Sequence, residues 1–375
     1  MKGIKLNNNN NLSKYFSILL SVITLILIIV PTQFSSTQSP KAYKAEVISV
    51  DNDNLEQYGI SKVGNQGVIV TILKGPYKDE NVKGVNLLMG KMELDSVYDV
   101  GDTVLVTPYI VDNEIKSVTL VGHYRIGIEI LLMTIFGSFL VFFAGWTGFK
   151  ALISFCFSAL MIFKVLLPLV LLGFNPIFIS LVVVICLSFV ILFVIGDFSK
   201  KGLASFLGTV SGIIVTCILS IIFTKLLKLS GAVRPFMETL LYSGYSQINI
   251  TDIFIASIFM AASGALMDIS MDVATSIEEV HRHNTSLTQS QLILSGFRVG
   301  RTVIGTMTTT LLLAYSSSYM GLLLVFIAQG TPLLQILNLN YVSSEILNTI
   351  VGSFSLVLTA PLTAIIAGLL YGEKK

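Results

Sequence analysis

The chain of 375 residues is 53% hydrophobic and 12% charged, and its mean hydropathy is +0.81. Soluble domains carry about 25% charged residues, so this composition excludes an ordinary soluble protein and predicts an integral membrane protein. A net charge of +2, without a basic cluster longer than Lys-Lys, gives no sign of nucleic-acid binding. Cys156, Cys186 and Cys217 lie in apolar runs without disulfide or metal spacing, and we expect neither a metal nor a cofactor.

The first apolar segment, residues 15–31, follows Lys2, Lys5 and Lys14. A short apolar run behind positive charges is typical of either an uncleaved signal anchor or a cleavable signal peptide. Because no small-x-small cleavage site follows, we favour an anchor that forms the first transmembrane helix. Residues 1–14 are then a cytoplasmic tail, and we expect its asparagine run to be disordered.

Residues 41–122 differ from the rest, because they are polar, alternating and rich in turn signals. Three segments predict strands, and Asp112-Asn113 between the last two predicts a hairpin turn. These segments are GVIVTIL, DTVLVTPYIV and EIKSVTLV. Several short strands in this space predict a small β-domain, a barrel or sandwich of OB-like type. Its expected role is that of a lid, a spacer or a module that docks a partner.

Seven further segments reach the roughly 20 apolar residues that a helix needs to cross a bilayer. They are residues 126–146, 151–173, 177–196, 202–224, 252–277, 303–327 and 346–371. Together with residues 15–31 they predict an α-helical polytopic membrane bundle of about eight transmembrane helices. Its seven-helix part covers residues 126–372, and the β-domain lies between the first and the second helix.

The lysines and arginines beside these segments predict the orientation. With the N-terminus inside, the cytoplasmic side receives most of them. The short outer loops receive Arg125, Lys225, Lys228 and Arg234. We therefore expect both termini in the cytoplasm and the β-domain on the extracytoplasmic side.

The loop before the seventh of the eight helices carries its own helix signal. Ser286 followed by Gln289 has the spacing of a capping box, and it opens the amphipathic stretch SLTQSQLILSGFRVGR. We expect this helix to lie along the cytoplasmic face and to lead directly into the seventh helix.

Two aspartates, Asp268 and Asp272, interrupt a long apolar run in the stretch GALMDISMDVATS. Four residues apart on a helix, they share one face. A carboxylate inside the hydrocarbon is costly and is rarely kept there without a partner or a task. Two interpretations stay open: an internal ion pair with Lys164 or Arg301, or a part in an ion or proton path. We expect both aspartates to face inward, against the third, seventh and eighth helices.

Small and hydroxyl-bearing residues recur three or four apart on the last three helices. Such stripes serve either close packing of helices or the lining of a path for ions or solutes. The candidates for that path on the seventh and eighth helices are Thr306, Thr309, Glu345 and Thr359. We expect Glu345 to lie at the outer mouth as a solvated carboxylate.

Two prolines, Pro168 and Pro361, fall inside the third and eighth helices. Each removes a backbone donor and frees the carbonyl oxygen four residues earlier, that of Lys164 or Val357. Freed carbonyls and broken helices form sites near the midplane of many transporters, although simple kinks are also common.

Four segments are long and ordered enough to suggest a family. They are GALMDISMDVATSIEE (264–279), SGFRVGRTVIGTMTTTLLLAYSSS (295–318), SSEILNTIVGSFSLVLTAPLTAIIAG (343–368) and FKVLLPLVLLGFNP (163–176). They resemble the YibE/F family of bacterial multi-span membrane proteins, and the resemblance covers residues 15–372. It implies a multi-pass protein of the bacterial plasma membrane, permease-like by description, and implies little biochemistry. From this resemblance we expect an acid to follow the residue that corresponds to Arg301 in related sequences. Here Thr302 follows, so Arg301 is expected to turn to Asp272 or Asp268 instead.

The leading functional hypothesis is a secondary transporter or permease coupled to protons or cations. Asp268 would be the proton or cation site and Asp272 an auxiliary carboxylate. Lys164 and Arg301 would be counter-charges or ligands for an anionic group. The alternative is a non-transporting scaffold or sensor whose β-domain binds an envelope partner. No G-x-x-x-x-G-K-[ST] loop occurs, so ATP-driven transport would need a separate subunit.

An intramembrane enzyme is the least favoured hypothesis. Aspartic chemistry needs two carboxylates that face each other, generally from different helices. His123, His281 and His283 lie outside the predicted helices, so a Ser–His pair or an H-E-x-x-H zinc site within the bilayer has no histidine. The expected partners are the lipid bilayer, a small solute or ion, and an envelope protein or further copies of the chain.

Overall fold

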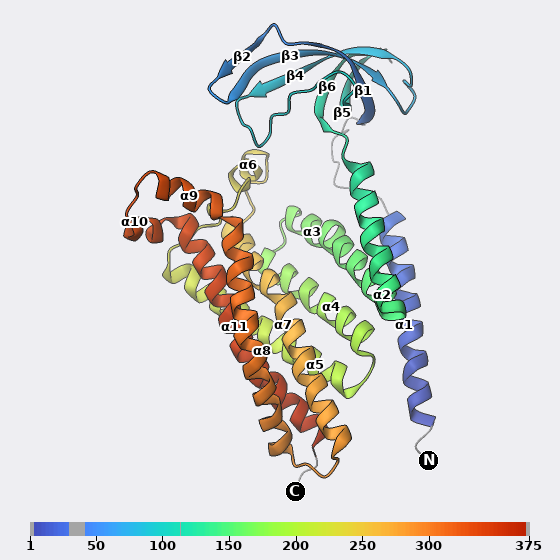
Figure 1. The fold of residues 1–375 in the computed structure, drawn as a ribbon, viewed down its shortest axis with the longest axis vertical. Helices are drawn as coiled ribbons and strands as arrows, with labels where there is room; N and C mark the ends of the chain where they lie inside the picture. Colours follow the sequence, from blue (N-terminus) through green and yellow to red (C-terminus); the bar gives the residue numbers. More distant parts are fainter. Residues whose placement is uncertain (1–3, 30–41, 113, 373–375) are drawn as a thin grey trace. The chain divides into compact units, whose positions relative to one another are not determined.

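The structure, a computed structural model, describes residues 4–29, 42–112 and 114–372 (Figure 1). The chain divides into two compact units, one of residues 32–139 and one of residues 1–31 with 140–375. The first is a small sheet domain followed by the start of a long helix, and the second is a bundle of helices.

The described part of the sheet unit holds six strands. They are β1 (Tyr43–Asp51), β2 (Leu55–Tyr58), β3 (Ser61–Ile72), β4 (Asn81–Met89), β5 (Thr103–Val111) and β6 (Glu114–His123). Paired strands run antiparallel, apart from a short parallel pairing of β4 with β6, and β1 pairs with both β3 and β5. The three predicted strand segments fall in β3, β5 and β6 and are confirmed. The hairpin between β5 and β6 forms with Asp112 at a φ of 54°, while Asn113 lies outside the described residues.

The core of the sheet unit comes from alternate residues of each strand, because successive side chains of a strand point to opposite faces. Ala45 of β1, Val70 and Ile72 of β3, and Val104 and Val106 of β5 are fully buried together. This packing explains why the period of two in the sequence predicted these strands.

A buried amide network ties the segment between β4 and β5 to the sheet. Gln66 Nε2 donates to the carbonyl oxygen of Tyr98 at 2.8 Å, and Gln66 Oε1 accepts from the Tyr98 N–H at 3.1 Å. Asn86 Nδ2 donates to Gln66 Oε1 at 3.1 Å and to the carbonyl oxygen of Ser96 at 2.7 Å. Buried polar groups are costly unless they are bonded in this way, so the network fixes one conformation of the segment.

Helix α1 (Ile4–Ile29) begins the helical unit. The asparagine run at residues 7–11, which we expect to be disordered, is helical in the structure. The apolar part of α1 is Tyr15–Ile29, which is shorter than a full membrane crossing. Residues 30 and 31, the end of the expected anchor, lie outside the described residues.

Helix α2 (Ile126–Met161) continues through a π-helical turn, η1 (Ile162–Leu166), into α3 (Leu167–Leu171). The sequence predicts two helices here with a loop at about 147–150. Instead, the helical path is broken at Gly145, whose φ of 55° and ψ of −127° suit glycine. The chain folds back there, because the carbonyl of Leu140 lies where a Cβ on Gly148 would be. In a straight helix these two residues would stand about 12 Å apart.

The remaining helices follow the predicted order, with one change. The long helices are α4 (Pro176–Gly196), α5 (Lys200–Leu226), α7 (Ile250–His283), α8 (Gln289–Ser318) and α11 (Asn340–Tyr371). The short ones are η2 (Gly231–Val233), α6 (Met237–Tyr242), α9 (Met320–Ala328) and α10 (Leu333–Asn338). The predicted span 303–327 is divided between α8 and α9, which meet at a 64° bend.

By the criteria of length and composition, the described part of the structure has fewer helices able to cross a membrane than the sequence predicts. Within the described residues, five helices are long and apolar enough to cross a bilayer, or six if α8 and α9 form one span. The expected total of about eight is therefore not confirmed.

The cap of α8 differs from the predicted one. Thr288 Oγ1 accepts from the N–H of Gln291 at 3.4 Å, and Gln291 Oε1 accepts from the N–H of Thr288 at 3.0 Å. The prediction of Ser286 with Gln289 is wrong by two residues, because Ser286 donates to Asn284 Oδ1 within the loop. The amphipathic stretch is helical, but it is the beginning of α8 rather than a separate helix.

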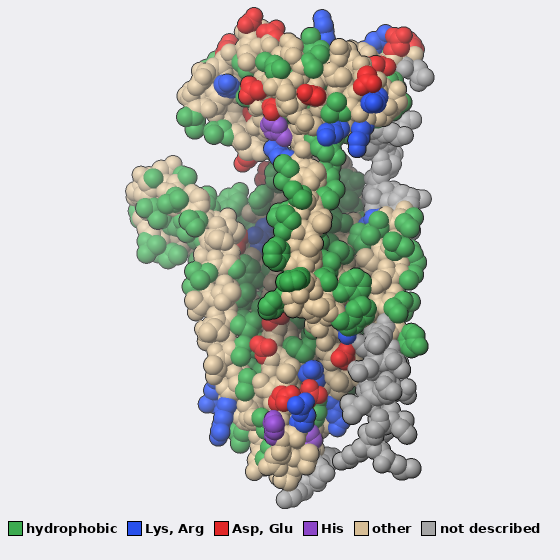
Figure 2. Space-filling model, turned by 45° about the vertical axis from the view of Figure 1, so that its right-hand side comes forward, with side chains coloured by type: hydrophobic (Ala, Val, Ile, Leu, Met, Phe, Trp, Pro, Cys, Tyr) green, Lys and Arg blue, Asp and Glu red, His purple; other side chains and the backbone are tan. Residues whose placement is uncertain are grey.

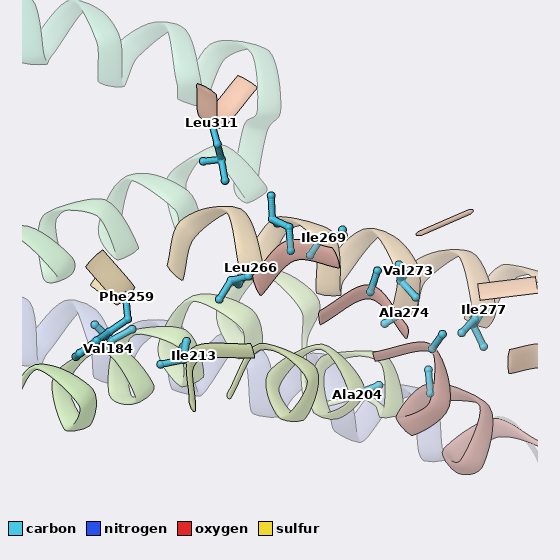
Figure 3. Packing of buried hydrophobic residues seen from close by; sticks show 14 of the residues in the cluster. Val184, Ala204, Ile213, Phe259, Leu266, Ile269, Val273, Ala274, Ile277 and Leu311 are labelled. Atoms are coloured by element: carbon cyan, nitrogen blue, oxygen red, sulfur yellow. The ribbon is translucent and has the colours of Figure 1, made fainter. Parts of the chain in front are cut away.

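The main core of the helical unit lies where α4, α5, α7, α8 and α11 meet (Figure 3). In Figure 3, Phe259 of α7 lies beside Val184 of α4, and Leu266 of α7 lies beside Ile213 of α5. These side chains are almost completely buried. Helix α7 is thus the element around which the others pack.

Helices α5 and α11 approach closely because glycines of α5 face threonines of α11. A Cβ on Gly208 would overlap Thr363 Oγ1, and one on Gly212 would overlap Thr359 Oγ1. Thr363 Oγ1 also lies within hydrogen-bond distance of Ser270 Oγ of α7, at 3.1 Å. Small residues spaced by four allow this approach in a bilayer, where burial of apolar surface does not drive helices together.

The surface of the helical unit is apolar along its flank and charged at one end (Figure 2). Phe142 and Phe143 are 89% and 92% exposed, as expected of side chains that face lipid. Charged side chains gather at that end in Figure 2. Lys201 of α5 pairs with Glu278 near the end of α7 at 3.4 Å. This distribution is that of a protein with a bilayer around its flank.

Candidate functional site: a charged cavity beside helix α11

A cavity of about 530 Å³ lies among η2, α6, the α8–α9 bend and the first turns of α11. Its polar lining includes Arg234, Glu238, Tyr319, Tyr341 and Glu345. Gly321 also lines it, and the space where that residue's Cβ would stand is open. A cavity of this volume can hold a small organic solute, since ligand sites commonly measure about 300 to 1,000 Å³.

An ion pair between a partly buried arginine and a buried glutamate forms one wall of the cavity. Arg234 Nη1 lies 2.6 Å from Glu345 Oε1, and Glu345 is only 9% exposed. The expectation that Glu345 is a solvated carboxylate is therefore wrong. Residue Val342 and others at the start of α11 are buried, so this turn of the helix faces the protein rather than water.

Arg234 and Asn348, which neighbour Glu345, each have a polar atom that the described residues leave unused. Asn348 Nδ2 donates to Glu345 Oε2 at 3.3 Å, but Asn348 Oδ1 and Arg234 Nε are buried and have no hydrogen-bond partner among the described residues. The guanidinium group of Arg234 also lies 5.3 Å from the ring centre of Phe254. The site thus offers a donor and an acceptor beside a pair of opposite charges.

Arg234 is the residue that sequence reasoning missed. In the orientation argument it counts merely as one of four basic residues in the outer loops. The signal that pointed to it is its departure from the positive-inside rule: an arginine in a short outer loop needs a local reason. Its partner Glu345 is 111 residues away, so no sequence spacing connects the two.

The two aspartates do not form the predicted internal ion pair. Asp268 and Asp272 are on the exposed face of α7, and neither has a cationic group within 4 Å among residues 15–29, 42–112 and 114–372. The face of α7 that meets α5, α8 and α11 is instead made of residues such as Leu266, Ile269 and Val273. The prediction that the aspartates face inward is wrong for this helical unit.

Lys164 has a different partner from the predicted one. Its Nζ donates to the carbonyl oxygens of Leu27 and Ile28, the latter at 3.1 Å. These carbonyls belong to the last turn of α1, where they lack partners within the helix and carry partial negative charge. Lys164 therefore caps α1. Pro168 is buried near the start of α3, directly after the π-helical turn that contains Lys164.

Arg301 and Pro361 lie beside the same cavity, which the sequence did not predict. They line a cavity of about 240 Å³ between α8 and α11, with Phe297, Ile304 and Val357. Val357 is the residue whose carbonyl Pro361 deprives of its helical donor. The side chain of Arg301 is exposed beside this cavity.

The threonines divide into two groups. Thr359 and Thr363 are fully buried and donate to carbonyls one turn earlier, so they serve helix packing. Thr306 and Thr309 are exposed and donate to the carbonyls of Val303 and Gly305, at 3.0 and 3.4 Å. They belong to an outward polar face of α8.

No group of three or more His, Cys, Asp or Glu side chains that could hold a metal ion occurs among the described residues. At the charged cavity, Arg234, Glu345 and the neighbouring tyrosines offer hydrogen bonds and ion pairs, and Asn348 bonds to Glu345 behind them.

These features define a helical integral membrane protein with a separate small sheet domain. The family model described as YibE/F-like protein matches residues 132–373, and the chain belongs to this family. The resemblance seen in the sequence is thereby confirmed. No curated protein and no solved structure matches the chain.

Proposed function

We propose that the protein is a plasma-membrane permease for a small charged solute, which binds in the cavity beside Arg234 and Glu345. The observation that carries the proposal is the buried pair with its unused atoms, Arg234 Nε and Asn348 Oδ1. A buried ion pair is costly to maintain and adds little stability over apolar packing, so its presence calls for a role. A solute with an anionic group would bond to Arg234, and its cationic or hydroxyl group would bond to Asn348 or Glu345.

The proposal includes the topology expected from the sequence. The break at Gly145 would allow residues 126–171 to cross twice, α8 with α9 would cross once, and residues 15–29 would form the anchor. This gives eight crossings, with both termini in the cytoplasm and the sheet domain outside. The sheet domain would be an OB-like barrel, which the pairing of β1 with both β3 and β5 supports.

Coupling to protons or cations is assigned to Asp268, with Asp272 as the auxiliary carboxylate. A carboxylate in hydrocarbon without a counter-charge must meet a proton, a cation or another protein. Lys164 is no longer a counter-charge in this proposal, because it caps α1. Arg301, beside its own cavity, keeps the proposed role of anion ligand.

Proton movement in liposomes tests the coupling. The purified protein is placed in vesicles that contain a pH-sensitive dye, and an inward proton gradient is imposed. Wild type is expected to dissipate the gradient faster than Asp268→Asn, while Asp79→Asn, the same change at an exposed site of the sheet domain, behaves like wild type. Equal rates for wild type and Asp268→Asn would remove the coupling role.

The cavity is tested separately with Gly321→Trp. A Cβ at Gly321 meets nothing within 4 Å, and Gly321 lines the cavity, so this position is chosen to place an indole in the cavity rather than in the core. We expect this variant to lose the thermal stabilisation that wild type gains from one of a panel of amino acids, amines, carboxylates and phosphates. A panel in which no compound stabilises wild type would count against a solute site.

The alternative function is a scaffold or sensor, and one observation favours it. Val85, Leu87 and Met89 of β4 point outward and are 50%, 58% and 65% exposed, which makes an apolar row on the sheet domain. Exposed apolar patches mark sites for protein partners. Leu87→Glu would abolish partner binding under this alternative, whereas under the permease proposal proton flux in liposomes stays unchanged.

A further inference from the structure

Helices α7 and α8 present an outward face that is unusually polar for a lipid-facing surface. Within the apolar part of α7 the exposed residues are Ala261, Gly264, Asp268 and Asp272. On α8 they include arginines and threonines: Arg298, Arg301, Thr302, Thr306, Thr309 and Thr310. Lipid-facing positions are normally apolar, and charged residues within a span normally meet a partner. This surface, the α7–α8 face, is therefore expected to contact another protein surface rather than lipid.

Two glycines on the α7–α8 face support the same conclusion. A Cβ on Gly264 or on Gly305 would meet nothing within 4 Å among the described residues. By contrast, a Cβ on Gly208 or Gly212 would overlap a threonine of α11, so glycine is needed at these two positions. Glycine inside a helix is less favourable than alanine, so glycine on an open face suggests an outside helix that approaches closely.

The contacts between α7 and α8 fix which residues share one depth. A Cβ on Gly296 would lie 2.6 Å from Ile277 Cδ1, and one on Gly300 would lie 3.8 Å from Val273 Cγ2. Because α7 and α8 run antiparallel, moving one residue towards the C-terminus of α7 corresponds to moving one residue towards the N-terminus of α8. Asp272, next to Val273, is therefore level with Arg301, next to Gly300. By the same register, Asp268 is level with Gly305.

These charges are not paired within the described part of the chain, although they share a depth. Gly296 and Val303 point from α8 towards α7 and the core, whereas Arg301 lines the cavity on the α11 side of α8. Helix α8 thus stands between Arg301 and the α7 of its own chain. The described residues hold no other cation that pairs with Asp268 or Asp272.

We propose that the α7–α8 face binds the same face of a second copy of this chain, around a two-fold axis along the membrane normal. Such an axis places α7 of one copy against α8 of the other at equal depth. Asp272 of each copy then meets Arg301 and Arg298 of the other copy, and Asp268 lies against Gly305, which leaves room for it. A face that carries both charge signs at one depth is complementary to itself, as a two-fold interface requires.

Disulfide trapping in membranes tests the geometry. In a background of Cys156→Ser, Cys186→Ala and Cys217→Ala, one tagged copy carries Asp268→Cys and a differently tagged copy carries Gly305→Cys. Mild oxidation is expected to link the two tags. Copies with Ile365→Cys on the exposed side of α11 provide the control and are expected to stay separate. Absence of the link, with both copies present in the membrane, would overturn the proposal.

Charge reversal tests the pairing independently of transport. Asp272→Arg or Arg301→Asp alone is expected to lower the dimer fraction in mild detergent about tenfold, and the double reversal is expected to restore it. Equal dimer fractions in all four proteins would contradict the pairing. A captured protein of another mass, linked in place of the second copy, would overturn the proposal and show that a different protein covers the face. If a reversal prevents folding, disulfide trapping alone decides, and neither test requires proton flux.

Discussion

Arg234 Nη1 and Glu345 Oε1 lie 2.6 Å apart, although 111 residues separate them in the chain. Arg234 comes from the η2–α6 segment and Glu345 from the first turns of α11. The pair therefore adds a polar link to the apolar contact of Leu229 and Val233 with Leu347 and Val351.

Removal of one partner is expected to be more harmful than removal of both. Arg234→Met leaves Glu345 buried and unpaired, and we expect a loss of about 3 to 5 kcal/mol in unfolding free energy. Arg234→Met with Glu345→Leu should recover most of this loss. Thermal unfolding in detergent measures both, and equal melting temperatures for the single variant and wild type would show that the pair contributes nothing.

The close approach of α5 and α11 predicts a steric effect at Gly212. Gly212→Ala introduces a Cβ that overlaps Thr359 Oγ1, so we expect a loss of about 1 to 3 kcal/mol from overpacking. Thr359→Ala in the same chain should relieve it. Gly127→Ala, whose Cβ meets nothing within 4 Å, is the control and should leave the melting temperature unchanged.

The amide network of the sheet domain predicts a local effect of Gln66→Ala. The change leaves the backbone groups of Tyr98 without their partners, and we expect a loss of about 1 to 3 kcal/mol. Hydrogen exchange should accelerate at residues 96–98 and remain slow in β5. Gln57→Ala, at an exposed site, is the matched control. Uniform acceleration over the whole domain would instead mean that the network supports the entire sheet.

Tyr98 predicts an alkaline limit to the stability of the sheet domain. Burial raises the pKa of this phenol above its usual value of 10, which outweighs the lowering effect of Arg125. The unfolded state therefore loses its proton first, and the stabilisation, complete below pH 10, declines as the pH rises towards the folded-state pKa. Proteolytic susceptibility of the domain should increase above pH 10 and do so less steeply in Tyr98→Phe. Identical pH profiles would exclude Tyr98 as the cause.

Some of the fold follows directly from the sequence. The strands β3, β5 and β6 were predictable because a half-buried strand alternates with period two. Helices α4, α5, α7 and α11 were predictable because a span needs a long apolar run. The break at Gly145 was not predictable. The sequence suggested a loop of several residues between two helices, whereas in the structure the helical path is broken at a single glycine.

The direction in which Asp268 points was decided by tertiary structure alone. A period near 3.6 shows that Asp268 and Asp272 share one face of α7, but lipid and protein interior are both apolar, so hydropathy does not say which face is inside. Likewise, composition determined that this chain belongs in a bilayer, whereas the pairing of Arg234 with Glu345 depends on which distant segments pack together. A sequence reports the environment along one helix at a time, and partners between helices exist only once the bundle has formed.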